Sequence, residues 1–150
     1  MCFQAELSMR PEKKLQILKN RIRQNPEDYK AFIKIGDIYK GFNNINGSIQ
    51  AYQRALKIKP NDETNINRLG EALWMAKRFS EAFYNFKKAL KINPKYPRAH
   101  LNIGKAFALV DDKPNAIAHT RFAAKLFRKN RNEKWEAKAR QYLNELYKYK

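Results

Sequence analysis

Cysteine, glycine and proline are scarce in this chain, and long apolar runs are missing. Its 150 residues include one Cys, 5 Gly and 6 Pro. Cys2 has no partner within the chain, so an intrachain disulfide framework is excluded. The first residues lack a basic region followed by a sustained apolar stretch, and no run reaches the roughly 18 apolar residues of a membrane helix. We therefore expect no export signal, no membrane span and a cytoplasmic location.

Acidic residues are also in short supply. The chain has 14 Asp and Glu against 32 Lys and Arg, a formal net charge of +18. Such an excess concentrates anionic partners at low salt, which favours an acidic partner. A second explanation is that Lys and Arg, which are good helix formers, cover solvated helix faces.

The residue patterns that carry most enzyme chemistry do not occur. The chain has no glycine-rich phosphate loop, no recognisable nucleophile with its base and no metal ligands at the usual spacing. His100 and His119 have no Cys or further His at ligand spacing. The sequence therefore predicts a protein that is not an enzyme and that has no catalytic residues, no metal and no cofactor.

A period of 34 residues organises the chain. Three columns follow this period: Pro26, Pro60 and Pro94; Gly36, Gly70 and Gly104; and Ala55, Ala89 and Ala123. Small residues let two antiparallel helices approach closely, and each proline ends a helix before a turn. The period therefore predicts three consecutive helix pairs.

This spacing resembles the tetratricopeptide repeat, whose pattern reads W-x2-L-G-x2-Y, then A-x3-F, then P. The middle unit matches best, through Leu69, Gly70, Ala82, Phe86, Ala89 and Pro94. In the third unit His100, Thr120 and Arg128 replace the aromatic residue, the Phe and the Pro. The resemblance implies an all-α fold, a right-handed α-solenoid of three helix-turn-helix units with a capping helix at each end.

The repeat divides a single domain, residues 1–150, into five parts. They are an N-terminal half-repeat or cap at 10–26, repeats at 29–62, 63–96 and 97–130, and a C-terminal capping helix at 132–148. The expected helices are 12–24, 29–42, 46–59, 63–76, 80–92, 97–110, 114–128 and 132–148. We expect the last helix to affect stability and solubility and not ligand recognition.

In this family the first helix of each unit lines a concave groove, the usual recognition surface. The resemblance places these residues in the groove: Lys30, Ile33, Lys34, Asp37, Asn67, Arg68, Glu71, Arg98, Leu101, Asn102 and Lys105. The cations would bind carboxylates, the asparagines would hold a peptide backbone, and Ile33 and Leu101 would give apolar contacts. The resulting hypothesis is a non-catalytic scaffold or adaptor that binds an extended, acidic peptide or partner protein.

The sequence also bears on other kinds of partner. The subgroup that grips chaperone C-terminal tails would need lysine, asparagine, asparagine, lysine and arginine at positions 33, 37, 68, 98 and 102. The chain has Ile33, Asp37, Arg68, Arg98 and Asn102 there, so a chaperone tail does not fit. The alternative is nucleic acid, RNA above all, bound through a basic surface that includes Arg121, Lys125, Arg128, Lys129, Arg131, Lys134, Lys138 and Arg140. Self-assembly through the repeat ends and a merely solvated groove stay open, as does the oligomeric state.

Overall fold

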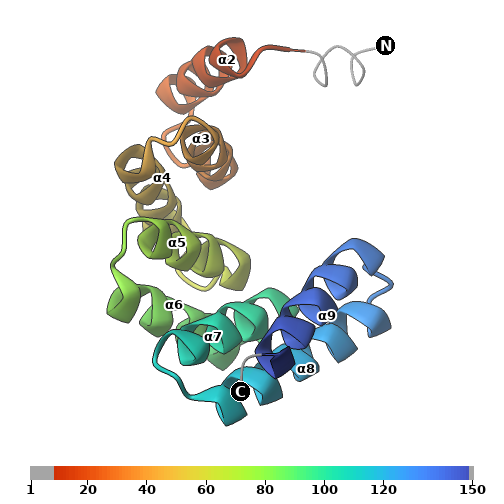
Figure 1. Cartoon of the computed structure of the whole chain (residues 1–150). Coiled ribbons are helices and arrows are strands. Elements are labelled where there is room, and N and C mark those ends of the chain that lie inside the picture. Colours follow the sequence, from red (N-terminus) through yellow and green to blue (C-terminus); the bar gives the residue numbers. More distant parts are fainter. Residues whose placement is uncertain (1–8, 149–150) are drawn as a thin grey trace.

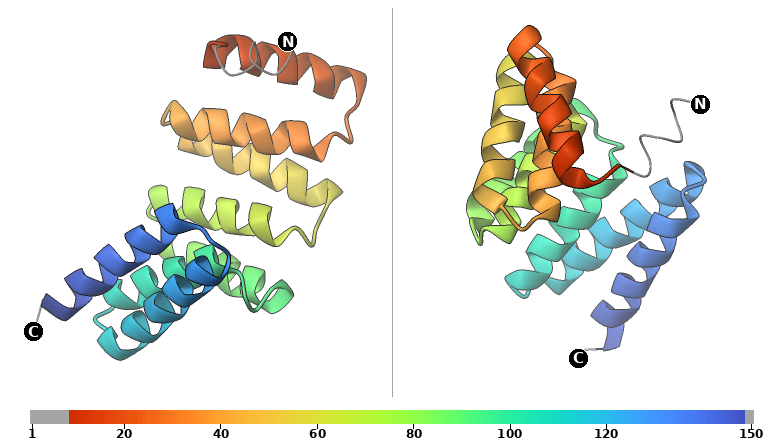
Figure 2. Two further views of the ribbon diagram at one scale, coloured as in Figure 1. Left: turned by 90° about the vertical axis from the view of Figure 1, so that its right-hand side faces the viewer. Right: turned by 90° about the horizontal axis from the view of Figure 1, so that it is seen from above.

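The computed structural model describes residues 9–148, and in that range the chain forms eight α-helices and no strand (Figure 1). They are α2 (Pro11–Gln24), α3 (Tyr29–Gly41), α4 (Ile45–Ile58), α5 (Glu63–Met75), α6 (Phe79–Ile92), α7 (Pro97–Leu109), α8 (Lys113–Lys129) and α9 (Glu133–Lys148). Figure 2 shows them stacked side by side into one curved array. The predicted all-α solenoid is confirmed. Cys2 lies outside the described residues.

Side-chain caps fix where several helices begin. The side chains of Asp28, Asn44, Asp62 and Asp112 accept hydrogen bonds from backbone N–H groups in the first turns of α3, α4, α5 and α8. Each cap of this kind stabilises a helix by about 1 kcal/mol, because it satisfies a donor that has no partner within the helix. α7 begins instead with Pro97, whose missing N–H costs nothing at that position.

The glycine column marks the closest contact within each helix pair. A Cβ atom on Gly70 would lie 2.5 Å from the Phe86 ring, and one on Gly104 would lie 2.5 Å from the Thr120 hydroxyl. A Cβ atom on Gly36 would overlap the ring of Tyr52. The expectation that these glycines allow close packing is therefore confirmed.

Large apolar residues join neighbouring pairs into one core. Tyr52 of α4, Leu73 of α5, Phe86 of α6 and Ile103 of α7 belong to one buried cluster. Burying such a side chain stabilises the fold by roughly 1.5–3 kcal/mol relative to leaving it exposed. Because the cluster spans three pairs, no pair has a core of its own.

The end of α8 differs from the ends of α4 and α6. Those two helices have 14 residues each, and Pro60 or Pro94 follows shortly after each. α8 has 17 residues, since Arg128 replaces the helix-ending proline. It ends in a turn through Arg131 at φ 55°, the conformation that Lys77 adopts between α5 and α6. The chain therefore leaves the third pair by the kind of turn found inside a pair.

α9 packs on the side of α8 that this turn exposes. Trp135 stacks on Phe127 with ring centroids 5.8 Å apart, and Ala139 is fully buried.

The division into a half-repeat, three repeats and a cap stays a prediction. Within the described part of the chain, no helix has both the length and the apolar character needed to cross a membrane.

Candidate functional site

The first helices of the three pairs, α3, α5 and α7, line a cavity of about 520 Å³. We call it the inner cavity. Its lining consists of Asp37, Lys40, Gly41, Glu71, Trp74, Met75, Phe86, Arg98, Asn102, Lys105 and Trp135. Residues from five helices, α3, α5, α6, α7 and α9, therefore line one space, although they come from positions almost 100 residues apart in the sequence.

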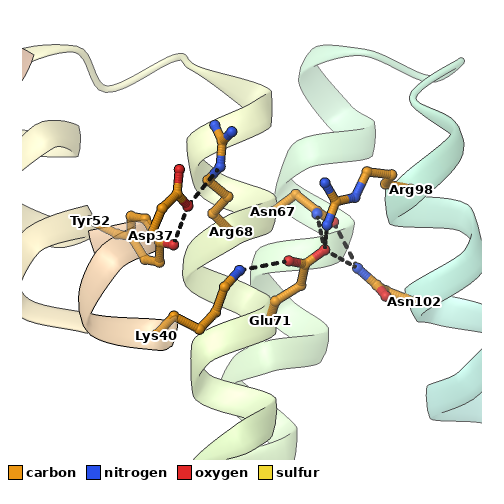
Figure 3. A network of polar contacts seen from close by, with 8 residues as sticks. All are labelled: Asp37, Lys40, Tyr52, Asn67, Arg68, Glu71, Arg98 and Asn102. Carbon is orange, nitrogen blue, oxygen red and sulfur yellow. Dashed lines mark hydrogen bonds and ion pairs between the residues drawn. The ribbon is translucent and has the colours of Figure 1, made fainter. Parts of the chain in front are cut away.

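Glu71 is the centre of a polar network in this cavity (Figure 3). Its Oε1 accepts hydrogen bonds from Arg98 at 2.6 Å, Asn67 at 2.9 Å and Asn102 at 3.3 Å. Its Oε2 lies 3.4 Å from the ammonium group of Lys40. Burial raises the pKa of Glu71, but the charges of Arg98 and Lys40 outweigh it, so the pKa is lowered overall. The network connects all three first helices.

Asp37 makes a second set of polar contacts. The Tyr52 hydroxyl donates a hydrogen bond of 2.7 Å to Asp37, and the Nε of Arg68 lies 3.3 Å from the same carboxylate oxygen. Burial, together with the hydrogen bond to Asp37, raises the pKa of Tyr52 well above its usual range. A core tyrosine and a partly exposed arginine thus hold Asp37 in place.

α9 forms one wall of the inner cavity. The guanidinium of Arg98 lies 4.6 Å from the ring centre of Trp135, and the ammonium group of Lys105 lies 5.9 Å from that of Tyr142. The residues of each helix are seven positions apart, so α9 runs beside α7 over two helical turns. The expectation that this helix acts only on stability stays a prediction, although Trp135 lines the candidate site.

Five of the residues expected in the groove line the inner cavity: Asp37, Glu71, Arg98, Asn102 and Lys105. Lys34 lines a separate cavity of about 330 Å³ between α2 and α3. Lys30 is exposed outside both cavities, and Ile33 packs against the core. The structure thus brings five of the expected residues of α3, α5 and α7 together and leaves those at the start of α3 apart.

Two expected contacts are contradicted by burial. Leu101 is only 2% exposed and packs against α8 and α9, so it has no free surface for an apolar contact with a peptide. Asn67 is fully buried, and its amide oxygen accepts a hydrogen bond of 3.1 Å from Asn102. Asn67 therefore holds Asn102 and Glu71, and only Asn102 retains access to the cavity.

Two of the cations expected to bind a partner already have carboxylate partners within the chain. Arg98 is bound to Glu71, and Arg68 is bound to Asp37. Both carboxylates were expected in the groove, but their pairing with these arginines was not, because each partner lies on another helix. Lys105 remains exposed, and no ion pair is recorded for it within the described residues.

Six residues of the cavity lining were not among those expected in the groove: Lys40, Gly41, Trp74, Met75, Phe86 and Trp135. Lys40 and Trp74 are 34 residues apart and lie three positions after Asp37 and Glu71, so the repeat period could have identified them. Trp135 carried no such signal, since the longer α8 shifts the period before α9 begins.

The two histidines meet outside the inner cavity. Their Nδ1 atoms are 3.0 Å apart, and the His100 Nε2 lies 2.9 Å from the carbonyl oxygen of Pro94. Because a carbonyl only accepts, neutral His100 donates through Nε2, and its Nδ1 accepts a hydrogen bond from the Nδ1–H of His119. The pair thus links α7 to α8. No group of three His, Cys, Asp or Glu suited to a metal occurs among residues 9–148.

A curved array of antiparallel helix pairs, with the first helices lining an inner cavity, defines the class of α-helical repeat solenoids. Residues 29–62 match the sequence profile of the family described as "Tetratricopeptide repeat", and residues 76–111 match that of "TPR repeat". The chain belongs to the tetratricopeptide repeat family.

Curated relatives match part of the chain. The Peroxisomal targeting signal receptor of Candida glabrata is 35% identical over 57% of this chain, and that of Saccharomyces cerevisiae is 30% identical over 59%. The aligned region spans 14% of the length of each receptor. The likeness thus covers a little more than half of this chain and a small part of each receptor.

Solved structures share the fold. The TPR2B domain of yeast Sti1, in a complex with pHsp70, has a TM-score of 0.74 at 19% identity, covering 81% of this chain and 98% of that domain. The first TPR of Spaghetti (RPAP3), bound to the HSP90 peptide SRMEEVD, has a TM-score of 0.69 at 18% identity, covering 80% and 90%. At these identities the likeness concerns the fold.

Proposed function

We propose that the protein is a non-catalytic scaffold that binds a short, extended segment of a partner protein in the inner cavity. The observation that carries this proposal is the cavity itself, which α3, α5, α7 and α9 line together. Its volume of about 520 Å³ lies in the range of ligand sites, roughly 300–1,000 Å³. The similarity to targeting-signal receptors and to repeat domains solved with chaperone partners supports a peptide as the ligand.

The cavity lining favours a peptide that combines a carboxylate with a bulky apolar side chain. Lys40, Arg98 and Lys105 are the cations at the cavity wall, and Asn102 offers its amide oxygen to the peptide backbone. Met75, which is 49% exposed, and Trp74 both line the cavity and give an apolar side chain a place to pack. The carboxylate would bind at Lys105 first, because Glu71 already binds both Arg98 and Lys40.

The experiment is a selection from a random peptide library, followed by titration of the selected peptides by calorimetry. We expect enrichment of sequences that pair Asp or Glu with Leu, Phe or Trp. The Lys105→Glu variant should bind them about tenfold more weakly, because it places like charges together. Lys95→Glu, which makes the same charge change at an exposed turn outside the cavity, is the matched control. Selection of no sequence, or equal loss in both variants, would overturn the proposal.

The peptide SRMEEVD tests the proposal against chaperone tails. The positions that would grip such a tail hold Ile33, Asp37 and Arg68, and Arg68 is already bound to Asp37. We expect fluorescence anisotropy to show no saturable binding of SRMEEVD to this chain. Tight binding would contradict this expectation and show that the protein binds chaperone tails.

A further inference from the structure

The second helices of the pairs, α4, α6 and α8, lie on the outer side of the array (Figure 1). α4 and α8 contain no Asp or Glu at all. α6 contains only Glu81, whose carboxylate is bound by Arg78 at 2.6 Å. These three helices therefore offer no unpaired carboxylate to their lysines and arginines.

The cations of these helices recur at the repeat period. Lys57, Lys91 and Lys125 occupy equivalent positions 34 residues apart, and all three are exposed. Arg54 and Lys88 lie three residues before Lys57 and Lys91, and Arg121 lies four residues before Lys125, so each is about one helical turn earlier. These three residues are also exposed. We call these six residues the basic ridge. The structure records no ion pair for Lys57, Lys91 or Lys125 within its described range.

Further cations extend the ridge at both ends. A cavity of about 360 Å³ between α2 and α4 is lined by Lys19, Arg23 and Arg54. A cavity of about 350 Å³ between α8 and α9 is lined by four cations, namely Arg121, Lys125, Arg128 and Arg140. Arg128 and Arg140 both bind Glu136 at 2.9 Å, which fixes their position. The positive surface thus runs the length of the molecule.

Two aromatic rings lie among these cations. Tyr84 is 67% exposed and lies four and seven residues before Lys88 and Lys91, on the same helix face. Phe122 is 40% exposed and takes the position equivalent to Lys88 in the next pair. Exposed aromatic rings between cations are the combination that binds single-stranded nucleic acid, since bases stack on the rings and phosphates pair with the cations.

We propose that the basic ridge binds the phosphate backbone of single-stranded nucleic acid, outside the inner cavity and independently of it. Three lysines at the repeat period, with further cations one turn before them, match a linear polyanion whose charges are evenly spaced. A membrane surface would touch only part of an outward-curved ridge. An acidic protein would need a cluster of large apolar anchors, and the ridge residues are almost all cationic.

The test measures the anisotropy of a fluorescent oligouridylate of about 20 nucleotides between about 50 and 200 mM salt. The variant Lys57→Gln, Lys91→Gln, Lys125→Gln should lower the slope of log affinity against log salt by about 2, since each neutralised phosphate contributes about 0.7. The control Lys13→Gln, Lys95→Gln, Lys148→Gln removes the same charge from exposed sites outside the ridge and should leave the slope unchanged. Tyr84→Ala should weaken binding about tenfold.

Three results would overturn the inference. The first is an equal loss of RNA affinity in the ridge and control variants. The second is an unchanged affinity for Tyr84→Ala together with equally tight binding of polyglutamate, which would mean that the ridge binds any polyanion. The third is binding to phosphatidylserine vesicles, lost in the ridge variant, without binding to RNA. Lys105→Glu should retain RNA binding, which separates this result from that of the peptide proposal.

Discussion

At the scale of single residues, the inner cavity depends on Glu71. Its side chain is 18% exposed and receives the positive charges of two other helices. Removing a largely buried partner of a charged pair leaves the other charges without compensation. A carboxylate of the protein itself therefore maintains the shape of the candidate site, which does not depend on a carboxylate from a ligand.

Glu71→Gln should lower the free energy of unfolding by about 2 kcal/mol near neutral pH, measured by urea titration. The pKa of Glu71 is lowered in the folded state, so its contribution is present above the unfolded pKa and is lost as pH falls through the folded one. The difference between wild type and variant should therefore shrink in acid. Glu81→Gln, at an exposed pair with Arg78, should leave stability almost unchanged. A constant difference at every pH would contradict this account.

Gly70→Ala tests the close contact between paired helices. Alanine favours a helix by about 1 kcal/mol over glycine, but its Cβ would meet the Phe86 ring at 2.5 Å. We expect a net loss of about 1–3 kcal/mol in thermal or chemical unfolding. Gly41→Ala is the matched control, because its Cβ would meet nothing within 4 Å. It should be neutral or stabilising, and equal losses at both sites would show that packing is not the cause.

At the scale of helices, the link between α7 and α8 responds to pH. Burial lowers the pKa of both His100 and His119 below the usual value of 6.5. Their neutral pairing therefore stabilises the fold above about pH 6.5, and this stability is lost as the pH falls through the lowered pKa values. The melting temperature should drop on acidification in this range.

His119→Gln is the variant for this measurement, because its amide retains a hydrogen-bond donor. We expect its melting temperature to depend less on pH between about 7.5 and 5.5 than that of the wild type. Equal pH dependence in the two proteins would show that the histidine pair does not carry the effect.

Most helix boundaries could be predicted from the sequence, because local chemistry sets them. Asp62 caps α5 and Pro94 follows α6, and the expected ranges 63–76 and 80–92 differ from the observed helices by one residue. The pairing of Glu71 with Arg98 could not be predicted, since the two are 27 residues apart and meet only through the stacking of α5 on α7. Counting charges without this geometry suggested a more positive groove than the one that forms.

At the scale of the whole molecule, α9 serves both the core and the inner cavity. Trp135 stacks on Phe127 with one part of its ring system and faces Arg98 in the cavity. Trp135→Leu retains an apolar side chain and should cost about 1–2 kcal/mol in stability. It should also weaken the binding of peptides selected on the wild type, because the stacking partner of Arg98 is lost.

The two effects of Trp135→Leu are separable. Circular dichroism melting measures the first, and calorimetric titration well below the melting temperature measures the second. Full peptide affinity in a folded Trp135→Leu variant would show that α9 is a cover for α8 and nothing more.

The missing proline at the end of α8 limits how the array could grow by duplication. A unit can be copied in tandem only where the chain enters and leaves it with the same geometry. The exits before Pro60 and Pro94 are alike, with Lys59 and Asn93 both extended, whereas α8 runs on to Lys129 and turns through Arg131. An extra 34-residue unit inserted after Pro60 or Pro94 should therefore lengthen the solenoid, and the same insertion after α8 should not.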